Sequence, residues 1–285
     1  MKVLFRSVLV LAGLLATGAC DKSESPGEPT PISSVVNYDA LGASDTIGYG
    51  GSAPCLPLIP CTTGSGYVQQ VTRRLQSEGR SVTLQNLGIP GAVLSPDVQV
   101  LGNSLGLDIY RNTLLDGAPY VRRTSTLVTV FIGANDANTV GRAVRDGHGG
   151  SNPAGYIQTQ IQNFARDMQT LVATVRGRSP DVRIIALNLP NMANTPYAAG
   201  LPLSEKRVLQ QLTVGFSAGI NALAAQGVTV VDLLCDPNFY NPAIFSSDGF
   251  HPNDAGYGYL TDLVYTAATA STPAPRSSCA FMTVY

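Results

Sequence analysis

The stretch LVTVFIGAND, residues 127–136, decides the predicted fold. Residues 127–132 are apolar at nearly every position, whereas a strand with one face in water would alternate apolar and polar residues. Such a run is typical of a strand that is buried on both faces, as in a parallel sheet covered by helices. The run ends in Gly133 and a polar Asn-Asp pair, so polar side chains follow directly at the end of the strand.

Similar short apolar runs recur on both sides of this stretch, with longer amphipathic segments between them. This alternation of strand and helix predicts a three-layer α/β/α sandwich around a five-stranded parallel sheet. Residues 34–285 are assigned to a single domain. We interpret residues 102–122, which have no clear period, as an insertion over one sheet edge, and residues 146–150 as a loop. The other strands are expected at residues 35–41, 82–87, 182–189 and 228–233, and the helices at residues 67–77, 156–175, 204–225 and 254–269.

Length and composition set limits on the class of protein. A chain of 285 residues is long enough for one large domain or two small ones, and one domain is the better interpretation. Hydrophobic residues make up 44% and charged residues 13%, which suits a compact core rather than a disordered chain. The formal net charge of −1 offers no attraction for a polyanion, so we exclude nucleic acid as a partner. Nothing in the sequence indicates an oligomeric state.

The first residues are typical of an export signal. Lys2 and Arg6 precede an apolar run at residues 8–16, which is shorter than the roughly 20 residues that a membrane-spanning helix needs. We therefore predict a signal peptide over residues 1–19.

The end of this signal, LATGAC at residues 15–20, resembles the lipobox of bacterial lipoproteins. The resemblance implies that Cys20 is lipidated after cleavage; the alternative is an ordinary signal peptide that leaves Cys20 as a free thiol. Residues 20–33 then form a disordered tether, because their proline and charged residues cannot bury enough apolar area to fold. The protein is thus expected to be exported and lipid-anchored to a bacterial membrane, on its periplasmic or cell-surface side.

Export affects the interpretation of the four remaining cysteines, because an oxidising compartment favours disulfides over metal thiolates. Three pairings are possible. We favour Cys55 with Cys61, which closes a small proline-rich loop, and Cys235 with Cys279, the pair that remains. A zinc site is the weaker alternative, because the chain has only 2 histidines and no CxxC spacing. We expect no metal.

In an open α/β sheet, ligands bind beyond the carboxyl ends of the strands. Polar or glycine-rich segments follow three of the expected strands: GASD at residues 42–45, NLGIPG at residues 86–91 and GAND at residues 133–136. Each has an ordinary explanation as well, because serine, asparagine and aspartate commonly form turns or cap helices. We interpret Asp45 and Asp136 as turn-forming residues.

Before the last expected helix, Asp248 precedes His251 by three residues. An aspartate at this spacing can accept the Nδ1–H of the imidazole and leave Nε2 free to act as a general base. The other histidine, His148, lies in a glycine-rich loop away from the expected strand ends, and we interpret it as a surface residue.

Four motifs together resemble those of the SGNH hydrolases, a superfamily that includes the GDSL esterases and lipases. They are Gly-x-Ser-Asp, the glycine turn, Gly-x-Asn-Asp and Asp-x-x-His. The resemblance spans residues 35–270 and implies a flavodoxin-like sandwich. It also implies that Ser44 is the nucleophile, His251 the base and Asp248 the residue that orients the base.

The resemblance further implies an oxyanion hole formed by the Ser44 N–H, the Gly91 N–H and the Asn135 side-chain amide. We choose Gly91 over Gly88 because the glycine of the family usually follows the strand by several residues. Ala43 stands where the family often has aspartate; that carboxylate takes no part in proton transfer, so the implied mechanism is unaffected.

The expected reaction is hydrolysis of a carboxylic ester through an acyl-enzyme, without a cofactor. Substrates would be small-molecule, lipid or carbohydrate esters, and apolar loop residues favour an acyl chain over a sugar. The alternatives are a carbohydrate O-acetyl esterase of the same mechanism and a lipid-anchored binding protein that keeps the fold without catalysis. Phosphate-ester hydrolysis is disfavoured, since no arginine or metal-ligand set follows the expected strands.

Overall fold

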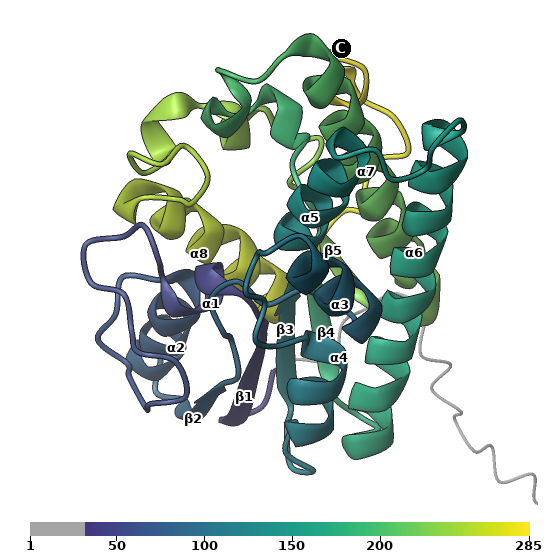
Figure 1. Cartoon of the computed structure of the whole chain (residues 1–285). Helices are drawn as coiled ribbons and strands as arrows, with labels where there is room; N and C mark the ends of the chain where they lie inside the picture. The colour runs from purple at the N-terminus through teal and green to yellow at the C-terminus, as the bar shows by residue number, and fades with distance from the viewer. Residues whose placement is uncertain (1–31) are drawn as a thin grey trace, which may run out of the picture.

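The computed structural model describes residues 32–285 (Figure 1). The predicted signal peptide and Cys20 lie outside the described residues, as does the predicted tether apart from its last two residues. Within residues 32–285, no helix is both long and apolar enough to cross a membrane.

Five parallel strands form one sheet, as the sequence predicted. Their order across the sheet is β2-β1-β3-β4-β5, which is the flavodoxin-like order. The central strand β3 is buried at every residue, which explains why its sequence lacks alternation. The last strand is shorter than expected. The strands are β1 (Val35–Gly42), β2 (Ser81–Asn86), β3 (Leu127–Phe131), β4 (Arg183–Leu187) and β5 (Thr229–Val231).

Helices cover both faces of the sheet. Figure 1 shows α2 and α8 on one side and α5, α6 and α7 on the other. The four expected helices are present as α2, α6, α7 and α8, although α6 extends further in both directions and α7 gives way to a 3-10 turn. The helices are α1 (Ser44–Ile47), α2 (Tyr67–Ser77), α3 (Pro96–Ser104), α4 (Thr113–Asp116), α5 (Ala134–Arg145), α6 (Pro153–Arg178), α7 (Leu203–Asn221) and α8 (Asp254–Thr269).

Two longer helices, α3 and α5, were not expected from the sequence. In α5, Asn135, Asp136, Asn138 and Gly141 are weak helix formers, so local propensity argues against a helix. The helix is stabilised instead by the burial of one face, because α5 packs against α3, α6 and α7.

The segment at residues 102–122 is more structured than expected. It contains the end of α3, the short helix α4 and a 3-10 turn, Ala118–Tyr120. Its last residue is tied to β1, because the Arg122 backbone N–H and Nε donate to the two carboxylate oxygens of the fully buried Asp39 at 2.8 and 2.7 Å. Arg122 also donates to the Thr83 carbonyl of β2 at 3.0 Å. The segment therefore adjoins β1 and β2, at the edge of the sheet.

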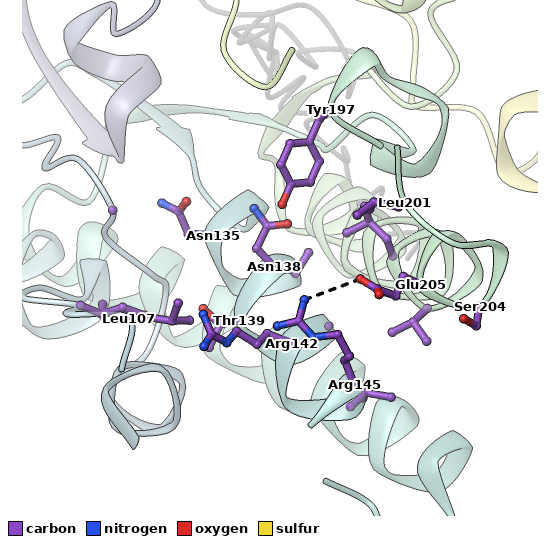
Figure 2. Close-up of a pocket in the computed structure, with 17 residues that line it drawn as sticks. Leu107, Asn135, Asn138, Thr139, Arg142, Arg145, Tyr197, Leu201, Ser204 and Glu205 are labelled. Atoms are coloured by element: carbon purple, nitrogen blue, oxygen red, sulfur yellow. Dashed lines mark ion pairs between the residues drawn. The ribbon is translucent and has the colours of Figure 1, made fainter. Parts of the chain in front are cut away.

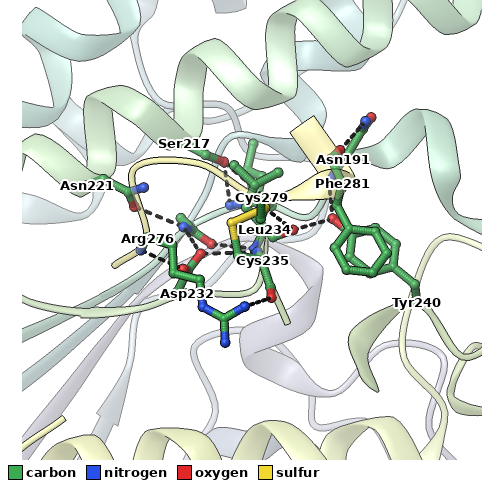
Figure 3. The surroundings of a disulfide bond; sticks show 12 residues. Asn191, Ser217, Asn221, Asp232, Leu234, Cys235, Tyr240, Arg276, Cys279 and Phe281 are labelled. Atoms are coloured by element: carbon green, nitrogen blue, oxygen red, sulfur yellow. Dashed lines mark hydrogen bonds between the residues drawn. A yellow bond between two sulfur atoms is a disulfide. The ribbon is translucent and has the colours of Figure 1, made fainter. Parts of the chain in front are cut away.

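Two disulfides join Cys55 to Cys61 and Cys235 to Cys279, the pairs expected from the sequence. The second pair connects the loop after β5 to the C-terminal segment (Figure 3). Near it the Phe281 ring stacks on Tyr240, with ring centroids 4.2 Å apart, and Asn191 Nδ2 donates to the Phe281 carbonyl at 2.8 Å. The C-terminal segment is thereby fixed against the loops that follow β4 and β5.

Candidate active site

Ser44 lies at the carboxyl end of β1, as the first residue of α1. The turn depends on Gly42, since a Cβ there would lie 2.3 Å from the Phe131 carbonyl oxygen of β3. Ser44 is 5% exposed, and its Oγ lies 2.8 Å from His251 Nε2. The chain thus brings together two residues that are 207 positions apart in sequence.

The imidazole of His251 is held on its other side by Asp248. His251 Nδ1 lies 2.6 Å from Asp248 Oδ2. The second carboxylate oxygen, Oδ1, accepts hydrogen bonds from Ser246 Oγ at 2.7 Å, the Phe250 N–H at 2.8 Å and the His251 N–H at 2.9 Å. Partial burial favours a higher pKa for Asp248, but these hydrogen bonds outweigh it and lower its pKa to about 2. The carboxylate is therefore ionised at neutral pH and can fix the tautomer of the histidine.

Two residues of this arrangement were not identified in the sequence. Ser246 donates to Asp248, and the ring of Tyr49 lies beside the His251 ring, with centroids 4.7 Å apart. Ser246 could have been identified from the sequence, because it lies two residues before an aspartate in a loop. Tyr49 could not, because its contact depends on how β1 and the C-terminal loop meet.

The three hydrogen-bond donors expected to form an oxyanion hole all lie at the carboxyl ends of the strands. The Ser44 N–H lies in the first turn of α1, where a helix has no internal acceptor. Asn135 Nδ2 donates to the Ala92 carbonyl at 2.9 Å, which fixes the amide and leaves its second N–H available. Across residues 32–285 we find no acceptor for the Gly91 N–H, whereas the Gly88 N–H donates to Asn86 Oδ1 at 3.0 Å.

Gly88 has a packing role instead. A Cβ on Gly88 would lie 1.4 Å from Thr46 Oγ1, so only glycine allows the end of β2 to approach α1 this closely. The structure therefore separates the two glycines of the turn: Gly88 packs against α1, and Gly91 presents a backbone N–H.

Asp136 supports the loop that carries Gly91. Its side chain is fully buried, and Oδ1 accepts a hydrogen bond from the Leu94 N–H at 2.9 Å. Within the described part of the chain, Oδ2 has no hydrogen-bond partner. Burial raises the pKa of Asp136 to about 7, and the hydrogen bond from Leu94 only partly opposes this shift.

Asp45, the residue after Ser44, borders small apolar cavities lined by Phe131, Leu189 and Phe250. Burial raises its pKa, and the nearby His251 acts in the opposite direction. His148 lies after α5, where its ring faces Tyr156 at 6.1 Å between centroids. Among residues 32–285, no group of three or more His, Cys, Asp or Glu side chains is arranged to hold a metal ion.

A cavity of about 680 Å³, here called the α5 cavity, begins beside Gly91 and Asn135, two of the residues expected to form the oxyanion hole (Figure 2). It runs along α5 and is bordered opposite that helix by the first turns of α7 and the loop before it. Its lining is mixed: the polar residues are Asn135, Asn138, Thr139, Arg142, Arg145, Tyr197, Ser204 and Glu205, and the others are Gly91, Leu107, Ile109, Ala137, Gly141, Val144, Leu201, Val208 and Leu209.

Chemically, the site combines a hydroxyl, an imidazole and an ionised carboxylate in a continuous hydrogen-bonded chain, with N–H donors beside the hydroxyl. This arrangement suits nucleophilic attack on a carbonyl carbon, followed by stabilisation of the resulting anion. All five residues named for the triad and the hole donors are found at this edge of the sheet.

Comparison with known proteins identifies the family. Residues 40–259 match the GDSL-like Lipase/Acylhydrolase family. No curated protein matches the sequence significantly.

Solved structures with the same fold include esterases and lipases. A lipase from a goat rumen metagenome superposes with a TM-score of 0.56 at 16% identity, covering 82% of this chain and 98% of that one. An acetyl xylan esterase variant from Geobacillus stearothermophilus gives 0.54 at 17% identity, with 86% and 100% coverage. A phospholipase A1 from Streptomyces albidoflavus gives 0.50 at 19% identity, with 82% and 99% coverage.

At these identities the structures establish the shared α/β fold, while the match over residues 40–259 establishes the family. The chain belongs to the GDSL-like lipase/acylhydrolase family.

Proposed function

We propose that this ester hydrolase acts through an acyl-enzyme formed on Ser44. The observation that carries the proposal is the hydrogen-bonded chain from Ser44 Oγ to His251 Nε2, at 2.8 Å, and from His251 Nδ1 to Asp248 Oδ2, at 2.6 Å. His251 accepts the hydroxyl proton as Oγ attacks the ester carbonyl, and the imidazolium then protonates the leaving alcohol. Water, activated by the same histidine, releases the acid.

The developing negative charge is on the former carbonyl oxygen. In the proposed mechanism the N–H groups of Ser44 and Gly91 and the amide of Asn135 donate to it. Asn135 is already oriented by its bond to the Ala92 carbonyl, so no reorganisation is needed as the charge forms.

The substrate proposed is a carboxylic ester with a sizeable group on one side of the carbonyl. The α5 cavity supports this choice, since about 680 Å³ beside the oxyanion donors is far more space than an acetyl group fills. A carbohydrate O-acetyl esterase, the second candidate from the sequence, would leave most of this cavity unused.

The test is hydrolysis of p-nitrophenyl esters from acetate to dodecanoate by the mature protein, with Ser44→Ala alongside. We expect activity that increases beyond acetate and that disappears in Ser44→Ala but not in Ser104→Ala, an exposed serine on α3. Covalent labelling of wild type, but not of Ser44→Ala, by a fluorophosphonate would identify the nucleophile independently. Full activity of folded Ser44→Ala would exclude the mechanism, and activity confined to acetate would favour the carbohydrate esterase.

We also propose that the protein is exported and anchored to a bacterial membrane through a lipid on Cys20. Its two disulfides support export, because they persist in oxidising compartments. Cys20→Ser is expected to move the protein from the membrane to the soluble fraction and to abolish incorporation of an alkynyl fatty acid. Unchanged membrane association would contradict the anchor.

A further inference from the structure

The two ends of the α5 cavity differ in chemistry: amide side chains lie at one end and arginines at the other. Asn135, Asn138, Arg142 and Arg145 are spaced by three, four and three residues on α5, so they share one helix face that borders the cavity (Figure 2). Asn135 lies at the oxyanion donors. Arg142 is seven residues further along, which corresponds to roughly 10 Å at about 1.5 Å per residue. A substrate that reacts at Ser44 and fills the cavity therefore extends towards Arg142.

Arg142 is only weakly paired. Its Nε lies 3.5 Å from Asp146 Oδ2, too far for a good hydrogen bond, and this nitrogen has no hydrogen-bond partner within residues 32–285. Over the same residues we find no ion pair or hydrogen bond made by its terminal nitrogens. Arg145, by contrast, contacts Asp146 at 3.3 Å and Glu205 at 3.8 Å.

The charges around Arg142 leave room for an anion. Glu205 is the carboxylate that borders the cavity, and it faces Arg145 rather than Arg142 (Figure 2). Asp146 lies on the solvent side, with 39% of its side chain exposed, where an ion pair contributes little. A guanidinium with its two terminal amino groups available binds carboxylate or phosphate in a bidentate manner.

Apolar residues also line the cavity. Leu107, Ile109, Ala137 and Val208 are among them, and they suit a short alkyl segment rather than a sugar. The matching ligand has an ester carbonyl at one end, an alkyl spacer, and a group for Arg142 at the other.

We propose that Arg142 binds an anionic group of the substrate, a carboxylate or a phosphate, about 10 Å from the ester carbonyl. The proposal rests on the proposed function and specifies its substrate class as esters that carry a negative charge. Arg142 acts as a specificity residue, and the reacting atoms remain those at Ser44.

The first experiment compares kcat/KM for the mono-p-nitrophenyl ester of suberic acid with that for p-nitrophenyl octanoate, which has the same chain length and no charge. We expect wild type to prefer the charged ester. Arg142→Gln should lose about 10- to 100-fold on the charged ester, because charge-assisted hydrogen bonds are lost, and less than about threefold on octanoate. Octanoate therefore reports on folding.

The matched control is Arg207→Gln, the same change of charge at an exposed residue of α7 that does not border the cavity. It should leave the preference intact. An equal loss in Arg207→Gln would indicate a general charge effect and overturn the proposal.

A second arm places the anion on the alcohol, with octanoyl glycerol phosphate compared to octanoyl glycerol. If Arg142 is needed for the preference for the suberate ester over octanoate, the acyl chain occupies the α5 cavity. If Arg142 is needed for the preference for octanoyl glycerol phosphate over octanoyl glycerol, the alcohol occupies it. Both results support the proposal. No Arg142-dependent preference in either arm would overturn it.

Binding distinguishes this proposal from the proposed function. Monomethyl suberate should bind to Ser44→Ala, and adding Arg142→Gln should weaken its Kd by about 10-fold or more, as measured by calorimetry. Arg142-dependent binding by a wild-type protein with no activity on any ester would overturn the proposed function alone. Active protein without Arg142-dependent binding or preference would overturn this inference alone.

Discussion

Two aspartates at the candidate site, one in a loop and one in a helix, show opposite electrostatic behaviour. Asp248, in the loop before α8, has 40% of its side chain exposed and accepts four hydrogen bonds. Asp136, in the first turn of α5, is fully buried and accepts one from a residue outside its own helix, Leu94. Its pKa is raised to about 7, while that of Asp248 is lowered to about 2.

The difference shows that the number of donors and access to water, rather than the residue type or its motif, decide the charge state of a carboxyl group. It also gives the two residues opposite effects on stability. The ionised form of Asp248 stabilises the fold above its ordinary pKa of 3.8, and this contribution is lost as the pH falls towards 2. The protonated form of Asp136 stabilises the fold below 3.8, and this contribution is lost as the pH rises through about 7.

The largest effect is expected from removing the charge of Asp248. Asp248→Asn should lower kcat by roughly 10³- to 10⁴-fold, because an amide does not hold His251 in the tautomer that a general base needs. The thermal midpoint should fall by a few degrees, because the stabilising contribution of the ionised carboxylate is lost. Kinetics on a p-nitrophenyl ester together with a melting curve would check both, and a decrease in activity below tenfold would contradict an orienting role.

Next in size is Asn135→Ala, at the residue before Asp136. Loss of one oxyanion donor typically costs about 10² to 10³ in kcat. Asn138→Ala is the matched comparison: it removes an amide from the same cavity without removing an oxyanion donor, and it should lower kcat by less than about tenfold. Near-wild-type turnover in folded Asn135→Ala would exclude its proposed role.

Removing the titratable group of Asp136 tests the other side of the comparison. As the pH rises from about 4 to 7, the free energy of unfolding of the wild type should decrease relative to that of Asp136→Asn. The expected difference in slope is up to about 1.4 kcal/mol per pH unit, because Asp136 loses its proton in this range only in the folded state. Denaturant titrations across this range would measure the difference. The exposed Asp97→Asn serves as the control, and parallel pH profiles for wild type and Asp136→Asn would show that Asp136 is ionised throughout.

The smallest effect is expected from Ser246→Ala, which removes one of the four hydrogen bonds to Asp248. We expect a loss of only a few-fold in kcat, and acid inactivation that begins at a higher pH because the pKa of Asp248 rises. An effect as large as that of Asp248→Asn would mean that Ser246, rather than the remaining donors, holds the carboxylate in place.

The sequence by itself determined the parallel sheet, four of the helices and the segments that carry the site. These features are local: an apolar run on nearly every residue requires burial on both faces, and glycine or polar residues must follow where the strand ends. The scarcity of histidine also directed attention to His251, because only His148 competed with it.

Only the tertiary structure decided the rest. Helix α5 forms because its buried face packs against α3, α6 and α7, which outweighs the weak helix propensity of its asparagines and glycine. Without that helix, the common face of Asn135 and Arg142 could not be recognised in the sequence. The raised pKa of Asp136 and the contact of Tyr49 with His251 likewise depend on which distant segments meet, and burial and proximity of that kind are properties of the packed chain alone.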